Sequence, residues 1–161
     1  MKKTNAMRIL EQEGIAYDTL AYTYDPQDLD VRKIAQENQL PIEQIYKTLA
    51  AWGDKTGLVV AVVPGHMKLR RKALAQATGN KKISLVPLDK LQALTGYIRG
   101  GCSPIGMKAQ PPVFVDATAE ALGYIWVNAG VRGILIGLRT DALLQASRGS
   151  LLDMSDPIPT A

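Results

Sequence analysis

Residues 95–108 of the chain read Thr-Gly-Tyr-Ile-Arg-Gly-Gly-Cys-Ser-Pro-Ile-Gly-Met-Lys, a stretch in which glycines, a serine and a proline lie between two cations. Paired glycines open backbone conformations that other residues avoid, and they leave main-chain N–H groups uncovered. Such a turn is suited to hold a carbonyl, an oxyanion or a phosphate. The same composition is typical of a plain tight connection between strands, which is the commoner reason for it.

Two other stretches favour the functional interpretation. Upstream, Lys47 interrupts an apolar run and shares its parity with Leu49 and Ala51. If those residues face the interior, the ammonium does too, and it must find anionic partners or lose its proton. The alternative is a strand lysine whose head group reaches solvent. Thr48 is expected on the other face. Downstream, residues 125–133 place polar groups and glycines after an apolar strand.

Length and composition predict one globular domain, residues 1–161. A chain of 161 residues with 47% hydrophobic and 21% charged residues is large enough to bury a core. The aromatic content of 6% argues against a surface that stacks many bases, while the net charge of +4 favours an anionic partner. One cysteine and one histidine exclude an internal disulfide and a cysteine-rich or multi-histidine metal centre, so neither a metal nor a cofactor is expected.

No apolar segment follows Lys2 and Lys3 as a leader, and no apolar run approaches the length of a membrane span. The expectation is a cytoplasmic protein without a membrane partner.

The hydrophobic periodicity and the turn residues predict a mixed order of elements. Helices are expected at 4–14, 31–40, 69–78, 87–94 and 140–147, with single helical turns after Pro41 and at 117–122. Strands are expected at 16–22, 45–51, 58–63, 81–86, 113–115, 124–127 and 134–138. This order predicts the α+β class, with a curved, mostly antiparallel, barrel-like sheet flanked by helices.

Two further features have competing interpretations. Cys102 lies in the glycine turn and suggests a nucleophile, but a catalytic thiol needs a base, and His66 sits in a distant Pro-Gly-His turn. The catalytic cysteine is therefore the weaker interpretation. Basic residues gather at Lys68–Lys72, next to the predicted 69–78 helix; they fit a phosphate backbone or a solvated helix face.

Three motifs together resemble one family. They are Tyr46-Lys47-Thr48, then Thr95-Gly96-Tyr97 leading into Gly100-Gly101-x-Ser103-Pro104-x-Gly106, then Trp126-Val127-x-x-Gly130-x-Arg132-Gly133. The combination is similar to the YbaK/EbsC family, free-standing relatives of the editing domain of bacterial prolyl-tRNA synthetases. The resemblance implies a trans-editing aminoacyl-tRNA deacylase that clears misacylated tRNA, typically Cys-tRNA(Pro). Its implied partners are the acceptor end of aminoacyl-tRNA and a prolyl-tRNA synthetase, with no cofactor.

The resemblance also implies roles for particular residues. Lys47 is implied to be the essential catalytic lysine, near the terminal adenosine and its phosphate, and Gly101 to hold the aminoacyl carbonyl. The implied substrate-binding residues are Tyr22, Thr48, Gly100, Ser103, Pro104, Gly106, Asn128 and Arg132. A cysteinyl substrate can then attack its own ester with its thiol, so that no enzyme nucleophile is required.

The third motif departs from the family pattern. Asn128, Ala129, Val131 and Leu135 stand where relatives that remove cysteine carry Ser, Gly, Lys and Asp. The loss of the Lys and the Asp removes a cation and an anion from the expected site wall. Three alternatives therefore stay open: a deacylase for another small amino acid, a weakly catalytic or non-catalytic protein of the same fold that binds tRNA or a nucleotide, and a thiol enzyme that uses Cys102.

Overall fold

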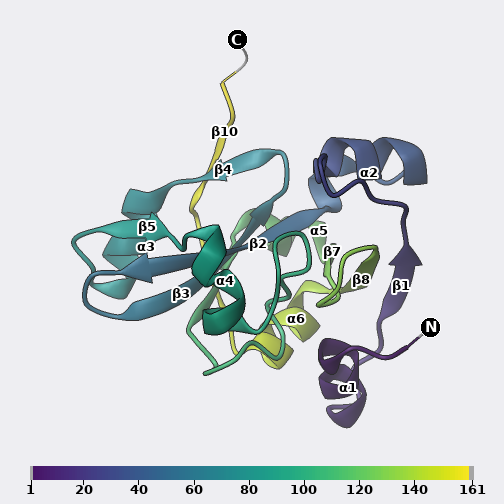
Figure 1. Ribbon diagram of the computed structural model, residues 1–161, viewed down its shortest axis with the longest axis horizontal. Coiled ribbons are helices and arrows are strands. Elements are labelled where there is room, and N and C mark those ends of the chain that lie inside the picture. Colours follow the sequence, from purple (N-terminus) through teal and green to yellow (C-terminus); the bar gives the residue numbers. More distant parts are fainter. Residues whose placement is uncertain (1, 160–161) are drawn as a thin grey trace.

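The computed structural model describes residues 2–159, which alternate between helices and strands along the chain (Figure 1). The α-helices are α1 (Asn5–Gln12), α2 (Val31–Asn38), α3 (Arg71–Thr78), α4 (Leu88–Thr95), α5 (Thr118–Leu122) and α6 (Thr140–Ser147), with a 3₁₀ helix η1 (Ile42–Gln44). The strands are β1 (Asp18–Ala21), β2 (Tyr46–Gly53), β3 (Gly57–Pro64), β4 (Met67–Leu69), β5 (Ile83–Leu85), β6 (Val113–Asp116), β7 (Tyr124–Asn128), β8 (Ile134–Arg139), β9 (Ser150–Leu152) and β10 (Ser155–Pro157).

The strands form three sheets. The largest has the order β5-β2-β3-β6-β9; β2 pairs antiparallel with β3 and β5, whereas β6 pairs parallel with both β3 and β9. A second, antiparallel sheet has the order β1-β8-β7, and β10 pairs antiparallel with β4. The α+β class is confirmed. The sheets stay open instead of closing into a barrel, because the end strands of each order, β5 and β9 or β1 and β7, do not pair with each other.

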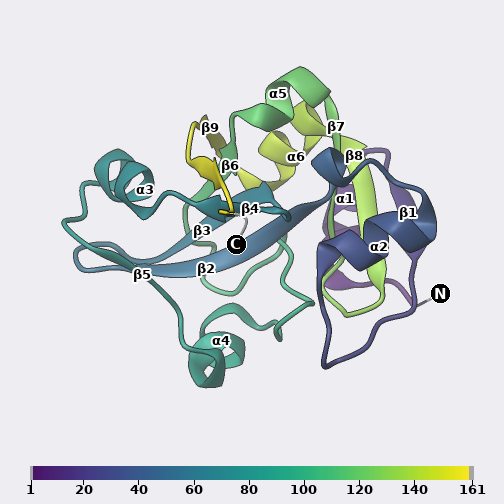
Figure 2. The ribbon, with the colours of Figure 1, turned by 90° about the horizontal axis from the view of Figure 1, so that it is seen from above.

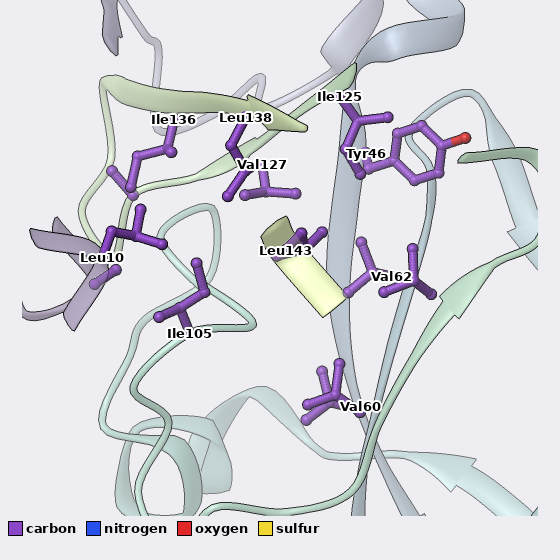
Figure 3. Close-up of a cluster of buried hydrophobic side chains, with 14 of the residues drawn as sticks. Leu10, Tyr46, Val60, Val62, Ile105, Ile125, Val127, Ile136, Leu138 and Leu143 are labelled. Carbon is purple, nitrogen blue, oxygen red and sulfur yellow. The ribbon is translucent and has the colours of Figure 1, made fainter. Parts of the chain in front are cut away.

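The main core lies between the two larger sheets (Figure 3). Figure 3 shows Val60 and Val62 of β3 facing Val127 of β7 and Ile136 of β8. Helices and loops close the cluster, with Leu10, Ile105 and Leu143 all fully buried within it. Burial of such side chains contributes roughly 1.5–3 kcal/mol each, so this cluster fixes how the two sheets sit against one another.

Helices α3 and α4 lie on opposite sides of the five-stranded sheet (Figure 2). Leu74 of α3 packs against Val59, Ala61 and Val63, the odd-numbered face of β3. Leu91 of α4 belongs to a separate cluster on the other face. The sheet is thus covered on both faces, and α3 reaches its β5 end, since Ile83 of β5 belongs to the same cluster as Leu74.

Most predicted elements are present within a few residues of their expected bounds. The prediction missed the three-residue strands β4, β9 and β10. Residues 67–69 show why: Leu69 was assigned to the following helix, but it pairs with Ser155 in β4 and β10 instead. Within residues 2–159, no helix combines the length and apolar character needed to cross a membrane.

Candidate functional site

A cleft of about 600 Å³ opens where the first half of β2 meets the segment between β1 and α2 and the loop after α4. Of the predicted site residues, Tyr22, Lys47, Thr48, Gly100 and Asn128 line it. These five come from four separate parts of the chain, so the fold brings together half of the ten predicted site residues in one cleft.

A buried hydrogen-bond network holds the start of β2, the strand that carries Lys47. The hydroxyl groups of Tyr46 and Thr118 lie 2.7 Å apart, and Thr118 Oγ1 donates to Asp116 Oδ2 at 2.6 Å. The Asp116 carboxylate, which is 1% exposed, also accepts from Ser155 Oγ and from the Met154 N–H. Because every oxygen of this carboxylate is satisfied, the network fixes β2 against β6 and β10.

Lys47 is half-buried and lies opposite Val63 in the β2–β3 register, on the same face as Leu49 and Ala51. The predicted parity is therefore confirmed. Burial lowers the pKa of the Lys47 ammonium, while the nearby Asp30 carboxylate, which also lines the cleft, opposes that shift. Within residues 2–159, Lys47 is in no ion pair. The cleft thus contains a cation that is partly stripped of water and open to an anionic ligand.

The main-chain hydrogen bonds of β2 and β3 show which N–H and C=O groups of β2 point toward the cleft. The Val60 N–H donates to the Pro112 carbonyl on one side, and the Val86 N–H donates to the Ala50 carbonyl on the other. Ala50 and Val60 are register partners, so they form a non-hydrogen-bonded pair. The polar main-chain groups of Ala50 therefore point away from β3.

Thr48 lies two residues before Ala50. Because the direction of main-chain groups repeats every two residues along a strand, the N–H and C=O of Thr48 also point away from β3. Strand β5 pairs only with Ala51–Gly53, so at Thr48 the edge of β2 faces the cleft. The Thr48 hydroxyl is buried and has no hydrogen-bond partner among the described residues. A buried unpaired hydroxyl costs stability unless a ligand satisfies it. Thr48 thus offers polar groups to a bound molecule.

The glycine turn is held from both sides. The Gly101 N–H donates to the Ile98 carbonyl at 2.9 Å, so it is occupied within the turn. A Cβ on Gly100, at φ +81°, would lie 2.9 Å from the Leu29 side chain, which explains why glycine is required there. Arg132 Nε donates to the Arg99 carbonyl at 2.7 Å. Gly101 and Arg132 therefore shape the turn and lie outside the lining of the cleft.

Asn128 joins the turn to the opposite wall. Its amide nitrogen donates to the Gly100 carbonyl and, at 3.4 Å, to the Tyr22 hydroxyl, while its oxygen accepts from the Gly130 N–H at 3.1 Å. One side chain thereby connects β7, the glycine turn and the chain after β1.

The other predicted binding residues lie deeper in the same loop. Ser103 and Pro104 are buried, and Ser103 Oγ accepts from the Ile105 N–H at 3.2 Å. The Gly106 carbonyl accepts from Asn5 of α1 at 3.4 Å. None of these three lines the cleft. Their positions support the loop, and a direct contact with a ligand would require the loop to move.

Cys102 lines the cleft but is poorly suited to act as a nucleophile. Burial raises the pKa of its thiol to about 11, and its sulfur donates to the Ile98 carbonyl at 3.6 Å. His66 does not line the cleft. The thiol is therefore neutral near pH 7 and lacks a histidine base.

The sequence analysis missed the acidic rim of the cleft, formed by Asp25, Asp28 and Asp30. One local feature of the sequence could have located this rim. Asp30 is the N-cap residue of α2, and its carboxylate accepts from the Arg32 N–H at 3.0 Å. Within the described residues 2–159 no group of three or more His, Cys, Asp or Glu side chains is placed to hold a metal ion.

The basic segment at Lys68–Lys72 is separate from the cleft and has two parts. Arg70 forms ion pairs with Asp156 at 2.8 Å and Asp153 at 3.6 Å, so it anchors the C-terminal strand β10. Arg71 and Lys72 are exposed and form no ion pair within residues 2–159.

Known proteins resemble this chain in sequence and in fold. Residues 25–146 match the family model of the aminoacyl-tRNA editing domain. EbsC of Enterococcus faecalis, whose name assigns it as a Cys-tRNA(Pro)/Cys-tRNA(Cys) deacylase, is 42% identical over 154 residues, covering 96% of this chain and 94% of that protein. A proline–tRNA ligase of Trichlorobacter lovleyi is 24% identical over 74% of this chain and 21% of its own length. The crystal structure of a protein described as a trans-editing enzyme for prolyl-tRNA synthetase superposes with a TM-score of 0.81 at 20% identity, covering 96% of this chain and 99% of that one.

Proposed function

This chain belongs to the aminoacyl-tRNA editing domain family, and from that premise we propose that it is a trans-editing deacylase whose main substrate is Cys-tRNA(Pro). The observation that carries the proposal is that the half-buried Lys47 and Thr48, whose hydroxyl has no hydrogen-bond partner among the described residues, line the same cleft. A cation and unpaired hydrogen-bond donors on one strand can bind an ester that lies next to a phosphate. The 42% identity with EbsC over nearly the whole of both chains supports the same activity.

The proposed reaction uses the substrate's own sulfur, since no histidine lines the cleft and the Cys102 thiol is neutral. The cysteinyl sulfur attacks its ester carbonyl carbon, a carbon–sulfur bond forms, and the bond from that carbon to the ribose oxygen breaks. The thiol proton passes to the ribose oxygen. The products are a cysteine thiolactone, which water opens later, and free tRNA.

In this reaction the protein contributes position and charge. The Thr48 N–H and hydroxyl donate to the carbonyl oxygen as negative charge develops on it, the role that sequence resemblance had given to Gly101. Lys47 stabilises the departing ribose oxygen and the nearby phosphate. Asn128 and Gly100 keep the opposite wall in place, and Tyr22 contacts the substrate from the side of β1.

The whole chain is proposed to act as a single editing domain on tRNA in the cytoplasm, where aminoacyl-tRNA is used. A prolyl-tRNA synthetase is the proposed partner, because matched segments of two proline–tRNA ligases make up 21% and 17% of those proteins. In those relatives the corresponding segment and the synthetase share one chain.

A second candidate substrate is tRNA(Pro) charged with a small apolar amino acid such as alanine. The observation that favours it is Leu135, which is 3% exposed and lines the cleft, so that an apolar surface stands where the family resemblance leads one to expect an aspartate. Water would then attack the ester, because alanine has no side-chain nucleophile.

One assay distinguishes these substrates. Purified protein is mixed with tRNA(Pro) charged with Cys, Ser or Ala, and loss of the aminoacyl ester is followed with time. We expect Cys-tRNA(Pro) to be cleared fastest, because a thiol is a better nucleophile than the near-isosteric hydroxyl of serine. Equal rates for Cys and Ser would reject attack by the substrate thiol, and fast clearance of Ala alone would establish the second candidate. Failure to clear any of them by a folded protein would reject the deacylase.

A further inference from the structure

A second pocket, of about 490 Å³, lies beside the cleft on the α4 side of the five-stranded sheet. Its walls are mostly apolar and include Trp52, Ser84, Val86, Pro87, Lys90 and Leu94. Figure 2 shows α4 on the side of β2 and β5 opposite α3. Val86 lines both the pocket and the cleft, so the two are adjacent.

Trp52 is held in a fixed place although it is 45% exposed. Its six-membered ring lies against Gly57, where an added Cβ would be 3.4 Å from the indole. Ser84 is its register partner on β5 and supports the other flank of the strand. The indole is therefore an ordered aromatic surface that turns toward the pocket, and no described residue covers it fully.

One lysine, Lys90, lines the pocket. Three more lie nearby in the sequence of the strands that form its walls: Lys81 and Lys82 precede β5, and Lys55 lies in the β2–β3 turn. In the described part of the chain none of the four forms an ion pair. Asp54, the nearby carboxylate, accepts from the main-chain N–H groups of Lys81 and Lys82 at 2.9 and 3.0 Å, which fixes the backbone of both lysines.

A flat aromatic surface with cations around it binds a nucleobase and its phosphate, because every base has a π face and every phosphate a negative charge. We propose that this second pocket binds a nucleotide of the single-stranded 3′ end of the tRNA, upstream of the aminoacylated adenosine in the cleft, with its base stacked on Trp52 and its phosphate near Lys90. The inference rests on the proposed function, since it is the cleft that receives the aminoacyl end. An exposed apolar surface also fits a protein partner, but Lys90 in the pocket wall and the adjacent cleft favour RNA.

The first test is binding and needs no catalysis. The chain has two tryptophans, so a Trp126→Phe variant reports Trp52 alone. This variant is titrated with an uncharged acceptor-stem hairpin that ends in its single-stranded 3′ tail and with the same hairpin made blunt-ended. We expect saturable quenching of Trp52 fluorescence by the tailed hairpin only. Equal quenching by both hairpins, or none, overturns the proposal.

The second test separates binding from chemistry in the deacylation assay. Trp52→Ala is expected to raise KM about tenfold with kcat unchanged, because stacking on an upstream base is the same in ground state and transition state. Trp126→Phe is the matched control and keeps the wild-type KM. Lys90→Ala is expected to reduce the salt slope of binding by about 0.7, the value for one phosphate contact with a single strand.

The outcomes separate this inference from the proposed function. An active enzyme whose Trp52→Ala variant melts like the wild type but has an unchanged KM overturns the pocket and leaves the deacylase standing. A dimer that dissociates on Trp52→Ala, seen by sedimentation, would instead make this surface an interface between copies and also overturn it. A wild type that quenches with tailed RNA yet deacylates nothing would reject the deacylase and retain the nucleotide site.

Discussion

The side-chain amide of Asn128, at the end of β7, donates a hydrogen bond to the main-chain carbonyl of Gly100 in the glycine turn. This bond joins two segments that each line the cleft but lie 28 residues apart in the chain. The oxygen of the same side-chain amide accepts a hydrogen bond from the Gly130 N–H, so both polar atoms of the amide are held. The width of the cleft between β2 and the turn therefore depends on Asn128.

We predict that Asn128→Ala lowers kcat/KM about tenfold, because it removes the hydrogen bonds that position the glycine turn, while the protein stays folded. Asn128→Asp is predicted to be worse, because it retains the acceptor for Gly130 but places a carboxylate oxygen against the Gly100 carbonyl. Steady-state kinetics and thermal melts measure both effects. Asn38→Ala, which removes a bond to the Ile34 carbonyl from an amide that does not itself line the cleft, is the control and should leave the rate unchanged.

Lys47 carries a stability cost that depends on pH. Burial holds its folded-state pKa below the unfolded value, so the folded protein bears the cost of a buried charge at every pH below that folded pKa. The cost decreases as pH rises between the two pKa values and is gone above the unfolded value, about 10.4. At neutral pH the protein therefore has a lower free energy of unfolding because Lys47 is charged in the cleft, where the charge serves to bind the substrate.

Lys47→Met is therefore predicted to abolish deacylation and to stabilise the fold at pH 7 by about 1 kcal/mol, a usual gain when a functional site is relieved of strain. The gain should disappear above about pH 10.4. Urea denaturation at several pH values measures it. Lys108→Met, at an exposed lysine, is the control. A Lys47→Met protein that is less stable than the wild type at pH 7, or that remains active, would contradict this account.

Asp30 is predicted to set the alkaline limit of activity. Its carboxylate raises the pKa of Lys47 against the effect of burial, so Asp30→Asn should lower that pKa further. The alkaline limb of the pH profile of kcat/KM should then move to lower pH. Asparagine caps a helix as well as aspartate does, so α2 is retained. Asp28→Asn, a neighbour on the same rim, should move the limb less; an equal shift from both would refute a specific role for Asp30.

The sequence predicted the elements whose signal is local. The parity of Lys47 with Leu49 and Ala51 placed the lysine on its correct face. Within residues 2–159, hydrophobic periodicity and turn residues located all six α-helices and seven of the ten strands. The parallel pairing of β6 with β3 and β9 could not be read in this way, because register between distant strands leaves no local pattern.

The remaining gaps concern side chains whose partners are distant in sequence. Arg70 resembled its basic neighbours until its partner Asp156 was known, 86 residues later. Trp52 resembled an ordinary strand residue until its exposure and the lysines around it were seen together. Both cases depend on tertiary contacts, which composition and spacing do not encode.

Cys102 is predicted to be dispensable for chemistry. Because its pKa is about 11, the thiol is neutral at working pH, and Cys102→Ala should keep kcat within a few-fold of the wild type. Alkylation of the wild type by iodoacetamide should be slow at pH 7 and accelerate as pH approaches 11. Complete loss of turnover in a Cys102→Ala variant that folds normally would restore the thiol-enzyme alternative.

The basic residues at Lys68–Lys72 are predicted to have two different roles, since Arg70 stabilises the fold whereas Arg71 and Lys72 bind tRNA phosphates. Arg70 donates through Nη2 to Asp156 at 2.8 Å and to the Ser155 carbonyl at 3.2 Å, so Arg70→Gln should release β10 and lower the melting temperature by about 3 °C. Its effect on the salt dependence of tRNA binding should be small, because its charge is already neutralised.

Arg71 and Lys72 are exposed on α3 and unpaired among the described residues. Reversing both to Glu should reduce the slope of log K against log salt by about two units, close to one per phosphate contact, with an unchanged melt. A slope that changes in Arg70→Gln, without a lower melting temperature, would show that Arg70 itself binds phosphate and that its pairing with Asp156 opens in solution.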